Sequence, residues 1–359
     1  MLRDLVSRLP KVELHRHLPG SLRLATIIEL AEEYGFPLPT HDPDELRQYV
    51  QVRPDTPASL GYILRTVSAF LRRCFVSRRA IARVAFEMVE DAWRDGIRYL
   101  EIRFSPWYLG AERNLSLEEV LDGVADGVAD ACARYPVRCA VLLGMTREAG
   151  TDACTRTAEF ALGAAGRLVR GVDLSGDEEA YPARLFRTAF ERIRSDGRLG
   201  ITVHAGEAAG PESVRDAVEL LGAQRIGHGV RIVRDLAVVD LVRARGIAME
   251  TCPTSNVLTG AVPSFAAHPL RTLLTHGVAA CINTDDPSWF NTTLTDEYCL
   301  ALTTLGLSFQ ELRQAALHAA LTAFLPVDDR RRLAQELDAA YAAAHARFAS
   351  LGFAADRDG

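Results

Sequence analysis

Two histidines stand two residues apart near the start of the chain, in the segment VELHRHLPG. His15 and His17 follow an apolar run and precede a Pro-Gly pair, which predicts that they lie at the carboxyl end of a β-strand. Side chains at i and i+2 of a strand point to one face, and two neutral imidazoles on one face are good zinc ligands. The alternative is a chance His-x-His on an exposed strand end.

A third histidine ends the apolar run GITVHAGE. Gly206 allows a sharp turn after His204, so the carboxylate of Glu207 can return over the same pocket. A carboxylate beside a metal-activated water can move a proton. The alternative for His204 is a buried core histidine that the backbone satisfies.

Two further groups follow apolar runs later in the chain. His228 lies between Gly227 and Gly229, which allow close approach of a ligand or only form a tight turn. Asp285 and Asp286 are adjacent in sequence, and their negative charges repel each other. The pair is therefore unfavourable unless a cation or hydrogen-bond donors stabilise it. One aspartate as a metal ligand and the other holding a water explains the pair better than a helix cap followed by a turn residue.

Eight short apolar runs alternate with helical patterns and are expected to position these groups. Parallel strands covered by helices, eight times over, predict an α/β fold of the (β/α)8 TIM-barrel type, in which chemistry lies at the carboxyl ends of the strands. The five other histidines fall in expected loops or helices, where we expect surface or packing roles: His41, His268, His276, His318 and His345. The expected strands are residues 11–17, 97–104, 137–144, 169–175, 200–204, 225–228, 247–251 and 279–284.

No linker divides the sequence, so residues 1–359 are expected to form a single barrel domain. The stretch of about 20–95 is too long for a βα loop and is predicted to be a helical insertion, with 59–73 as its best amphipathic segment. Apolar spacing within 330–349 predicts an additional C-terminal helix.

The composition excludes several classes of protein. A formal charge of −6 and a pI of about 5.9 argue against nucleic acid as a partner. The 7 cysteines include no Cys-x-x-Cys pair, which argues against a disulfide framework. We find no signal-peptide pattern, no membrane-spanning run and no glycine-rich phosphate loop, and we expect a cytoplasmic protein.

Seven motifs, in order from about residue 9 to 300, resemble the adenosine deaminase family of the metal-dependent amidohydrolases. They are LPKVELHRHLPGSL, EIRFSP, VDLSGDE, HAGE, RIGHGVR, ETCPTSNVLTG and INTDDPSWFNTTLTDEY. HAGE, GHG and NTDDP together are highly specific. The resemblance implies a (β/α)8 barrel, in agreement with the strand count, and a hydrolase that acts on a cyclic amidine C–N bond.

The resemblance also implies a metal and its ligands. One zinc ion (Zn2+) per chain is expected, held by the residues that match the family's ligands: His15, His17, His204 and Asp285. The zinc supplies hydroxide from water near neutral pH. The His/Cys/Cys site of zinc cytidine deaminases has no counterpart in this sequence.

Catalytic and substrate-binding roles carry over in the same way. Glu207 matches the glutamate that protonates purine N1, His228 the histidine beside the attacking water, and Asp286 the aspartate that orients this water. Gly176 matches the glycine whose N–H contacts purine N3. The expected substrate-contacting residues are therefore Gly176, His17 and Asp286.

One position departs from the family pattern. Where family members often have His-Leu-Asp-Gly, this chain has Pro19, which lacks an acceptor side chain and a backbone donor. The family aspartate reaches toward the ribose 5′-hydroxyl, so the chemistry at the base is unaffected and the 5′ side is open. The expected reaction converts an adenine nucleoside to its 6-oxo form and ammonia, with adenosine or 2′-deoxyadenosine as the default. A 5′-modified adenosine, aminofutalosine or adenine is the alternative.

Two other classes of function remain. A different metal-dependent amidohydrolase would act on an amide or ester, but the chain has a single lysine, Lys11, and no candidate for a carbamylated strand lysine. A non-enzymatic binding protein would be expected to lack one of the seven ligand and catalytic residues, and all are present. The sequence leaves the oligomeric state open.

Overall fold

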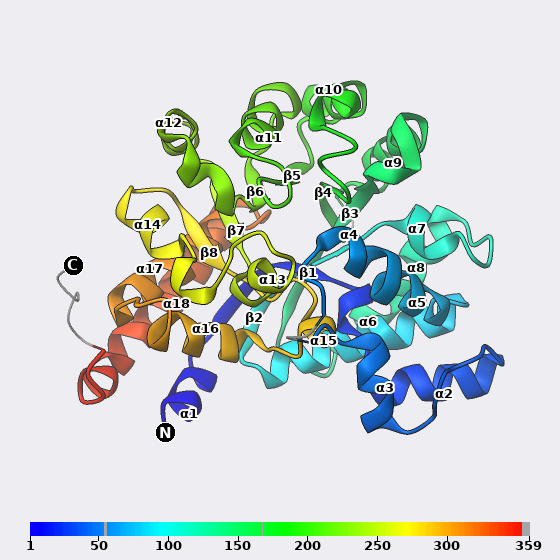
Figure 1. The fold of residues 1–359 in the computed structure, drawn as a ribbon, viewed down its shortest axis with the longest axis horizontal. Coiled ribbons are helices and arrows are strands. Elements are labelled where there is room, and N and C mark those ends of the chain that lie inside the picture. The colour runs from blue at the N-terminus through cyan, green and yellow to red at the C-terminus, as the bar shows by residue number, and fades with distance from the viewer. Residues whose placement is uncertain (54–55, 167, 354–359) are drawn as a thin grey trace.

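The computed structural model describes residues 1–53, 56–166 and 168–353. Eight strands run parallel, and each pairs with the next in the order β1 to β8. They form the centre of the molecule in Figure 1, with helices around them. The fold is the predicted (β/α)8 barrel. The strands are β1 (Lys11–His17), β2 (Ile97–Phe104), β3 (Arg138–Thr146), β4 (Val169–Ser175), β5 (Gly200–Ala205), β6 (Arg225–His228), β7 (Ala248–Thr251) and β8 (Ala280–Ile282).

The residues that follow β8 close the barrel against β1. The Asp285 N–H donates to the His15 carbonyl at 3.0 Å, and the His17 N–H donates to the Asp285 carbonyl at 2.9 Å. Below them, the Leu14 N–H donates to Asn283 Oδ1 at 2.9 Å. The seam of the barrel therefore places the aspartate backbone directly beside the two histidines of β1.

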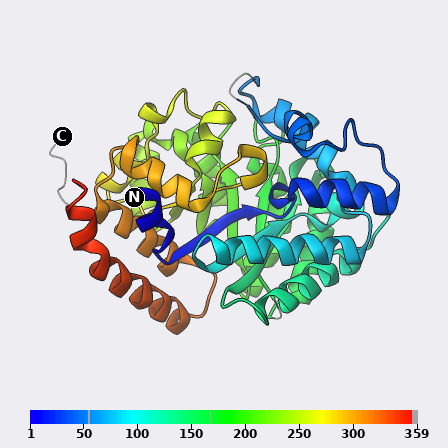
Figure 2. The same cartoon turned by 90° about the horizontal axis from the view of Figure 1, so that it is seen from below.

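Helices cover the outside of the barrel (Figure 1), and Figure 2 shows the same packing from below. Among the described residues, no helix is both long enough and apolar enough to cross a membrane. Outside the β1–β2 connection the helices are α1 (Leu2–Ser7), α7 (Pro106–Gly110), α8 (Leu117–Cys132), α9 (Gly150–Ala164), α10 (Arg187–Asp196), α11 (Pro211–Asp216), α12 (Leu236–Ala244), α13 (Pro253–Leu258), α14 (Leu270–Thr275), α15 (Pro287–Phe290), α16 (Leu294–Thr303), α17 (Phe309–Thr322) and α18 (Val327–Ala349).

The connection from β1 to β2 is helical. The amphipathic segment expected at 59–73 folds as α4, a π-helical turn η2, α5 and a short 3₁₀ turn in succession. In Figure 1, α2 and α3 lie away from the barrel axis, whereas α4 lies near the end of the barrel. The elements are η1 (Pro19–Ser21), α2 (Leu24–Tyr34), α3 (Pro43–Val50), α4 (Leu60–Ile63), η2 (Leu64–Ser68), α5 (Ala69–Leu71), η3 (Arg72–Cys74) and α6 (Arg78–Arg94).

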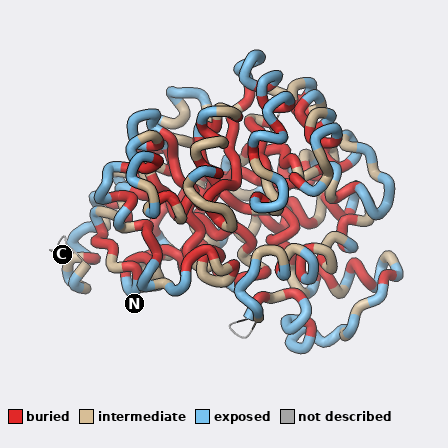
Figure 3. The backbone as a smooth tube through the Cα atoms, turned by 45° about the horizontal axis from the view of Figure 1, so that its top comes forward, coloured by how far each residue is buried: buried red, intermediate tan, exposed pale blue. Residues whose placement is uncertain are grey.

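The interior of the barrel is buried, as Figure 3 shows, but it is not entirely apolar. Alternate residues of β2, Glu101 and Arg103, are fully buried, as are Arg225 of β6 and Glu250 of β7. Arg225 donates to Glu250 at 2.6 Å and also contacts Glu101. Buried charges need such partners, so the strands carry a paired ionic layer beneath the carboxyl ends.

Two helical glycines differ in how closely other atoms approach them, and this difference tests the packing of α8 against α6. A Cβ at Gly127 of α8 would overlap the Ala82 carbonyl oxygen of α6, whereas a Cβ at Gly163 of α9 would meet nothing within 4 Å. We expect Gly127→Ala to lower the free energy of unfolding by about 1–3 kcal/mol because of overpacking. Gly163→Ala should raise it by about 0.5–1 kcal/mol. Denaturant titration of both variants measures this, and equal effects would contradict the described α6–α8 contact.

Candidate active site

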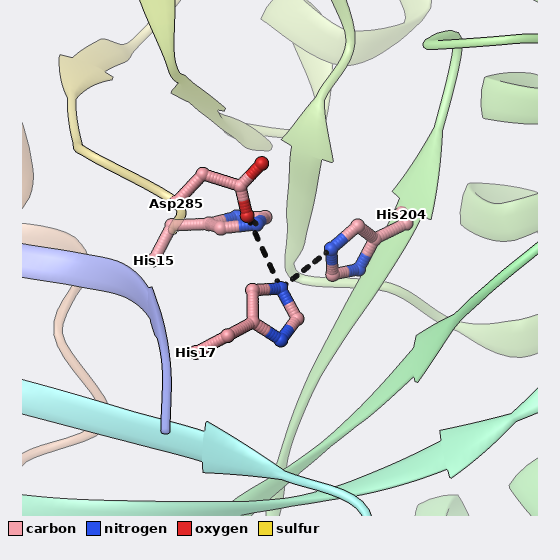
Figure 4. Close-up of side chains that lie close together, drawn as sticks. All are labelled: His15, His17, His204 and Asp285. Atoms are coloured by element: carbon pink, nitrogen blue, oxygen red, sulfur yellow. Dashed lines mark hydrogen bonds and ion pairs between the residues drawn. The ribbon is translucent and has the colours of Figure 1, made fainter. Parts of the chain in front are cut away.

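Four side chains converge at the carboxyl end of the barrel (Figure 4). His15 and His17 come from β1, His204 from β5, and Asp285 from the seam after β8. Asp285 Oδ1 lies 3.2 Å from Nε2 of both His15 and His17. His17 Nε2 lies 3.2 Å from His204 Nε2. The structure thus brings together all four residues predicted as metal ligands.

The donor atoms fit a zinc ion. Ligands at 2.0–2.1 Å in a tetrahedron are separated by about 3.3 Å, close to the spacing of these atoms. His15 Nε2 is buried and has no hydrogen-bond partner among the described residues. Buried polar atoms normally have a partner, so this nitrogen is a good candidate for a metal ligand. Burial lowers the pKa of His204 to about 4, so its imidazole is neutral at physiological pH. Three imidazoles and one carboxylate form a donor set that suits zinc.

A second group of potential ligands overlaps the first. Cys252, His228 and Asp285 also have donor atoms close together. Burial, with the charge of Asp285, raises the pKa of the Cys252 thiol well above its ordinary value, which disfavours the thiolate that a metal needs. The set built on His15, His17 and His204 is the better metal site.

Buried carboxylates form hydrogen bonds with Nδ1 of two of these histidines, the ring nitrogen that is not directed at the candidate metal site. Glu250 Oε2 lies 2.8 Å from His15 Nδ1, and Asp173 Oδ1 lies 3.0 Å from His204 Nδ1. Arg103 contacts both carboxylates, Glu250 at 2.7 Å and Asp173 at 3.3 Å. Because the carboxylates accept from Nδ1–H, the Nε2 lone pairs are left for the metal.

Glu207 is held by the turn that follows β5. The carboxylate of Glu178 accepts the backbone N–H groups of Gly206, Glu207 and Ala209 at 2.7–2.9 Å. Burial, with the charges of Asp285 and Glu178, raises the pKa of Glu207 well above its ordinary value. Its Oε1 is buried without a partner. The side chain is therefore a buried carboxyl group whose protonated form is favoured.

A chain of hydrogen bonds fixes His228. Asn256 Nδ2 donates to His228 Nδ1 at 3.0 Å, which leaves the proton of the neutral ring on Nε2. His268 Nε2 lies 3.1 Å from Asn256 Oδ1, and the Leu270 N–H donates to His268 Nδ1 at 3.2 Å. His228 has a φ of 62°, a strained conformation typical of functional sites. A Cβ on the preceding Gly227 would lie 2.8 Å from His15 Cε1, which confirms the close approach expected of the glycines.

These groups line one cavity of about 380 Å3. Its lining includes His17, Gly176, Asp286 and also Trp289 and Thr259. Single polar atoms of Glu207, Asp286, Thr259 and Trp289 are buried there without a partner among the residues that the structure describes. Unpaired buried polar atoms on one cavity indicate a polar ligand, since each costs free energy until a partner arrives.

Comparison with known proteins agrees with this geometry. The adenosine deaminase family model matches residues 10–340. An adenosine deaminase of Shigella dysenteriae is 40% identical over 331 residues, which cover 92% of this chain and 98% of that protein. This chain belongs to the adenosine deaminase family. As such it is a hydrolase that acts on a cyclic amidine C–N bond.

Solved structures of other deaminases resemble this adenosine deaminase family member. An adenine deaminase from Arthrobacter aurescens has a TM-score of 0.85 and 26% identity, over 92% of this chain and 98% of that one. Arabidopsis ADAL in complex with IMP has a TM-score of 0.83 and 26% identity, over 95% of this chain and 99% of that one. The similarity therefore extends over nearly the whole barrel.

Several residues of this family member escaped the sequence analysis. Asn256 and His268 belong to the chain that holds His228, so the expectation that His268 has only a surface or packing role was wrong. Arg103, Asp173 and Glu250 were not singled out either. A signal was available for these three, because each is an ionisable residue inside a strand that was expected to be buried.

Proposed function

We propose that this chain is a zinc-dependent hydrolytic deaminase of adenine nucleosides, with one zinc ion per chain. His15, His17, His204 and Asp285 would hold the ion. When bound, zinc acidifies a water molecule so that hydroxide is available near neutral pH. The convergence of these four donors with Glu207 and His228 on one cavity is the observation that supports the proposal.

Glu207 is the proposed proton donor to purine N1. Its raised pKa keeps the carboxyl protonated, and its unpartnered Oε1 belongs to a residue on the cavity wall. As C6 becomes tetrahedral, N1 must gain a proton, and a buried carboxylic acid supplies it. Gly176, at a φ of 106° on the same cavity, is the proposed contact for purine N3.

His228 and Asp286 are the proposed groups that aim the attacking water. With its proton on Nε2, His228 offers a hydrogen bond to the oxygen nucleophile and to the alkoxide that develops on C6. Asp286 has one buried oxygen, Oδ1, without a partner and can accept from the same water. His17 completes the wall beside them. Ammonia then leaves, and the 6-oxopurine remains.

Replacement of Asn256 tests the role of the hydrogen-bond chain. We expect Asn256→Ala to lower kcat about 10–100-fold, with zinc content unchanged, because His228 loses the donor that sets its tautomer. Steady-state kinetics with metal analysis measures both quantities. A kcat equal to that of the unmodified protein would show that Asn256 does not act through His228.

An ultraviolet assay on metal-analysed protein tests the proposed reaction. We expect 6-aminopurine nucleosides to be converted to 6-oxopurines with one ammonia released per turnover, and adenosine, 2′-deoxyadenosine, adenine and aminofutalosine should be compared directly. Absence of turnover on every 6-aminopurine, with zinc bound, would refute the function and leave the fold unaffected.

A further inference from the structure

The turn that carries Pro19 is fixed beside the catalytic groups. Pro19 lies in η1, directly after β1, and lines the cavity. Ser21 Oγ donates to the His17 carbonyl at 2.9 Å and accepts from Arg16 Nε at 3.1 Å, which pins the turn. A Cβ at Gly20 would overlap the Asp286 carboxylate. The hydrogen bonds of Ser21 and the close packing of Gly20 against Asp286 hold the turn in place. The ring of Pro19 is therefore a fixed part of the cavity wall.

Apolar side chains from three other parts of the chain complete this end of the cavity. The lid segment (α4 and η2) supplies Leu60, Ile63 and Leu64, and α15, which packs on η1, supplies Trp289 and Phe290. The α7 helix adds further aromatic surface through its side chains Trp107 and Tyr108. Four segments distant in sequence thus build one apolar compartment.

Three polar side chains of this compartment, those of Ser68, Tyr108 and Arg72, are already engaged with protein partners. Ser68 Oγ lies 2.9 Å from the Tyr108 hydroxyl, and Arg72 is paired with Glu112 at 3.0 Å. Trp289 Nε1 is buried without a partner, but an indole N–H only donates, so it offers no acceptor to a hydroxyl proton. A 5′-hydroxyl would therefore lose its water without regaining a full set of hydrogen bonds.

A phosphate fits this compartment no better. The carboxylate of Glu148 lines the cavity, and the guanidinium of Arg72 is already paired with Glu112. The remaining lining arginine, Arg65, is exposed. Like charges repel a dianion in such a cavity.

We propose that the preferred substrate is an adenine nucleoside whose 5′ carbon carries an uncharged apolar group, such as an alkylthio or arylthio substituent, in place of the hydroxyl. This inference rests on the proposed function, since it assumes that the base lies against Glu207 and Gly176. The sugar then extends toward Pro19 and the aromatic residues of α15, where an apolar 5′ group is buried. A thioether sulfur can accept weakly from Trp289 Nε1.

The test compares kcat/KM for adenosine, 5′-deoxyadenosine, 5′-methylthioadenosine and AMP on zinc-loaded protein. We expect 5′-methylthioadenosine to exceed adenosine by at least about tenfold, the scale on which a pocket discriminates apolar from hydroxyl groups. AMP should be the poorest of the four. A smaller ratio, or AMP as the best substrate, would overturn the inference while the deaminase function stands. No turnover of any of the four would instead refute the function.

Variants of Pro19 test whether this residue sets the preference for an apolar 5′ group. The quantity compared is the ratio of kcat/KM for 5′-methylthioadenosine to that for adenosine. Pro19→Asp introduces an acceptor for a 5′-hydroxyl and a charge against an apolar group, so the ratio should fall at least about tenfold. Pro19→Ala, the matched control without an acceptor, should keep the preference for the methylthio compound. Leu64→Ser, at an apolar lining residue of η2, should also lower the ratio. An unchanged ratio in both Pro19→Asp and Leu64→Ser, each with full zinc content, would overturn the proposal.

Discussion

Replacement of Glu207 by glutamine should lower kcat by about 10²–10⁴-fold, the usual contribution of a general acid. Glutamine keeps the size and hydrogen-bonding shape of the side chain but has no proton to give to N1. Zinc content should stay at one per chain, because Glu207 is not among the four converging ligands. Steady-state rates normalised to bound zinc measure the effect.

The control for this variant is Glu212, in the first turn of α11. Glu212 is exposed and accepts the Gly210 N–H at 3.1 Å, so Glu212→Gln should keep nearly the full rate. A zinc-replete Glu207→Gln protein with a normal rate would remove Glu207 from the mechanism.

The same carboxyl predicts a pH dependence. Since burial raises its pKa and the protonated form is the donor, the rate should be full below that pKa and fall as the pH rises through it. In Glu207→Gln this alkaline limb should disappear from the residual activity. A pH–rate profile of both proteins measures it, and an alkaline limb that persists in the variant would assign it to another group.

Replacement of Arg103 by methionine should both destabilise the protein and weaken its hold on zinc. Arg103 is fully buried and contacts the carboxylates that hold His15 and His204. Although burial opposes it, Arg103 together with Arg225 holds the pKa of Glu250 well below its usual range. Removal of one partner of a buried ion pair typically costs about 3–5 kcal/mol. Loss of support for metal ligands weakens metal binding about 10–100-fold.

Arg78 provides the matched control. It also contacts two carboxylates, those of Asp122 and Asp126, but its side chain is 51% exposed. Arg78→Met should therefore leave both the free energy of unfolding and the zinc affinity almost unchanged. Denaturant titration and competition with a zinc chelator measure the two effects. Equal behaviour of the two variants would mean that the buried ionic layer does not support the metal centre.

The sequence predicted the barrel and the convergence of the four candidate metal ligands because both depend on local patterns. Apolar runs such as 97–104 and 169–175 correspond to β2 and β4 residue for residue. The side chains of His15 and His17 needed only the two-residue period of a strand to meet. The closing of the barrel then brought Asp285 beside them.

The supporting residues could not be predicted in the same way. Asn256 lies in the short helix α13 and His268 in a loop, and the chain path that brings them to His228 is set by tertiary packing. The role of Pro19 also depended on residues far away in sequence, since only the fold places the lid segment and α15 around it. The amphipathic segment expected at 59–73 is helical but includes the π-helical turn η2, which apolar spacing does not reveal.

Titration of metal-free protein with zinc tests the central claim most directly. The ligand set His15, His17, His204 and Asp285 forms a single site, so the rate of adenine nucleoside deamination should rise linearly and stop rising at one equivalent of zinc per chain. His17→Ala, titrated in parallel, should gain little activity at the same zinc concentrations. Full activity in the metal-free protein, or a break at two equivalents, would contradict the account.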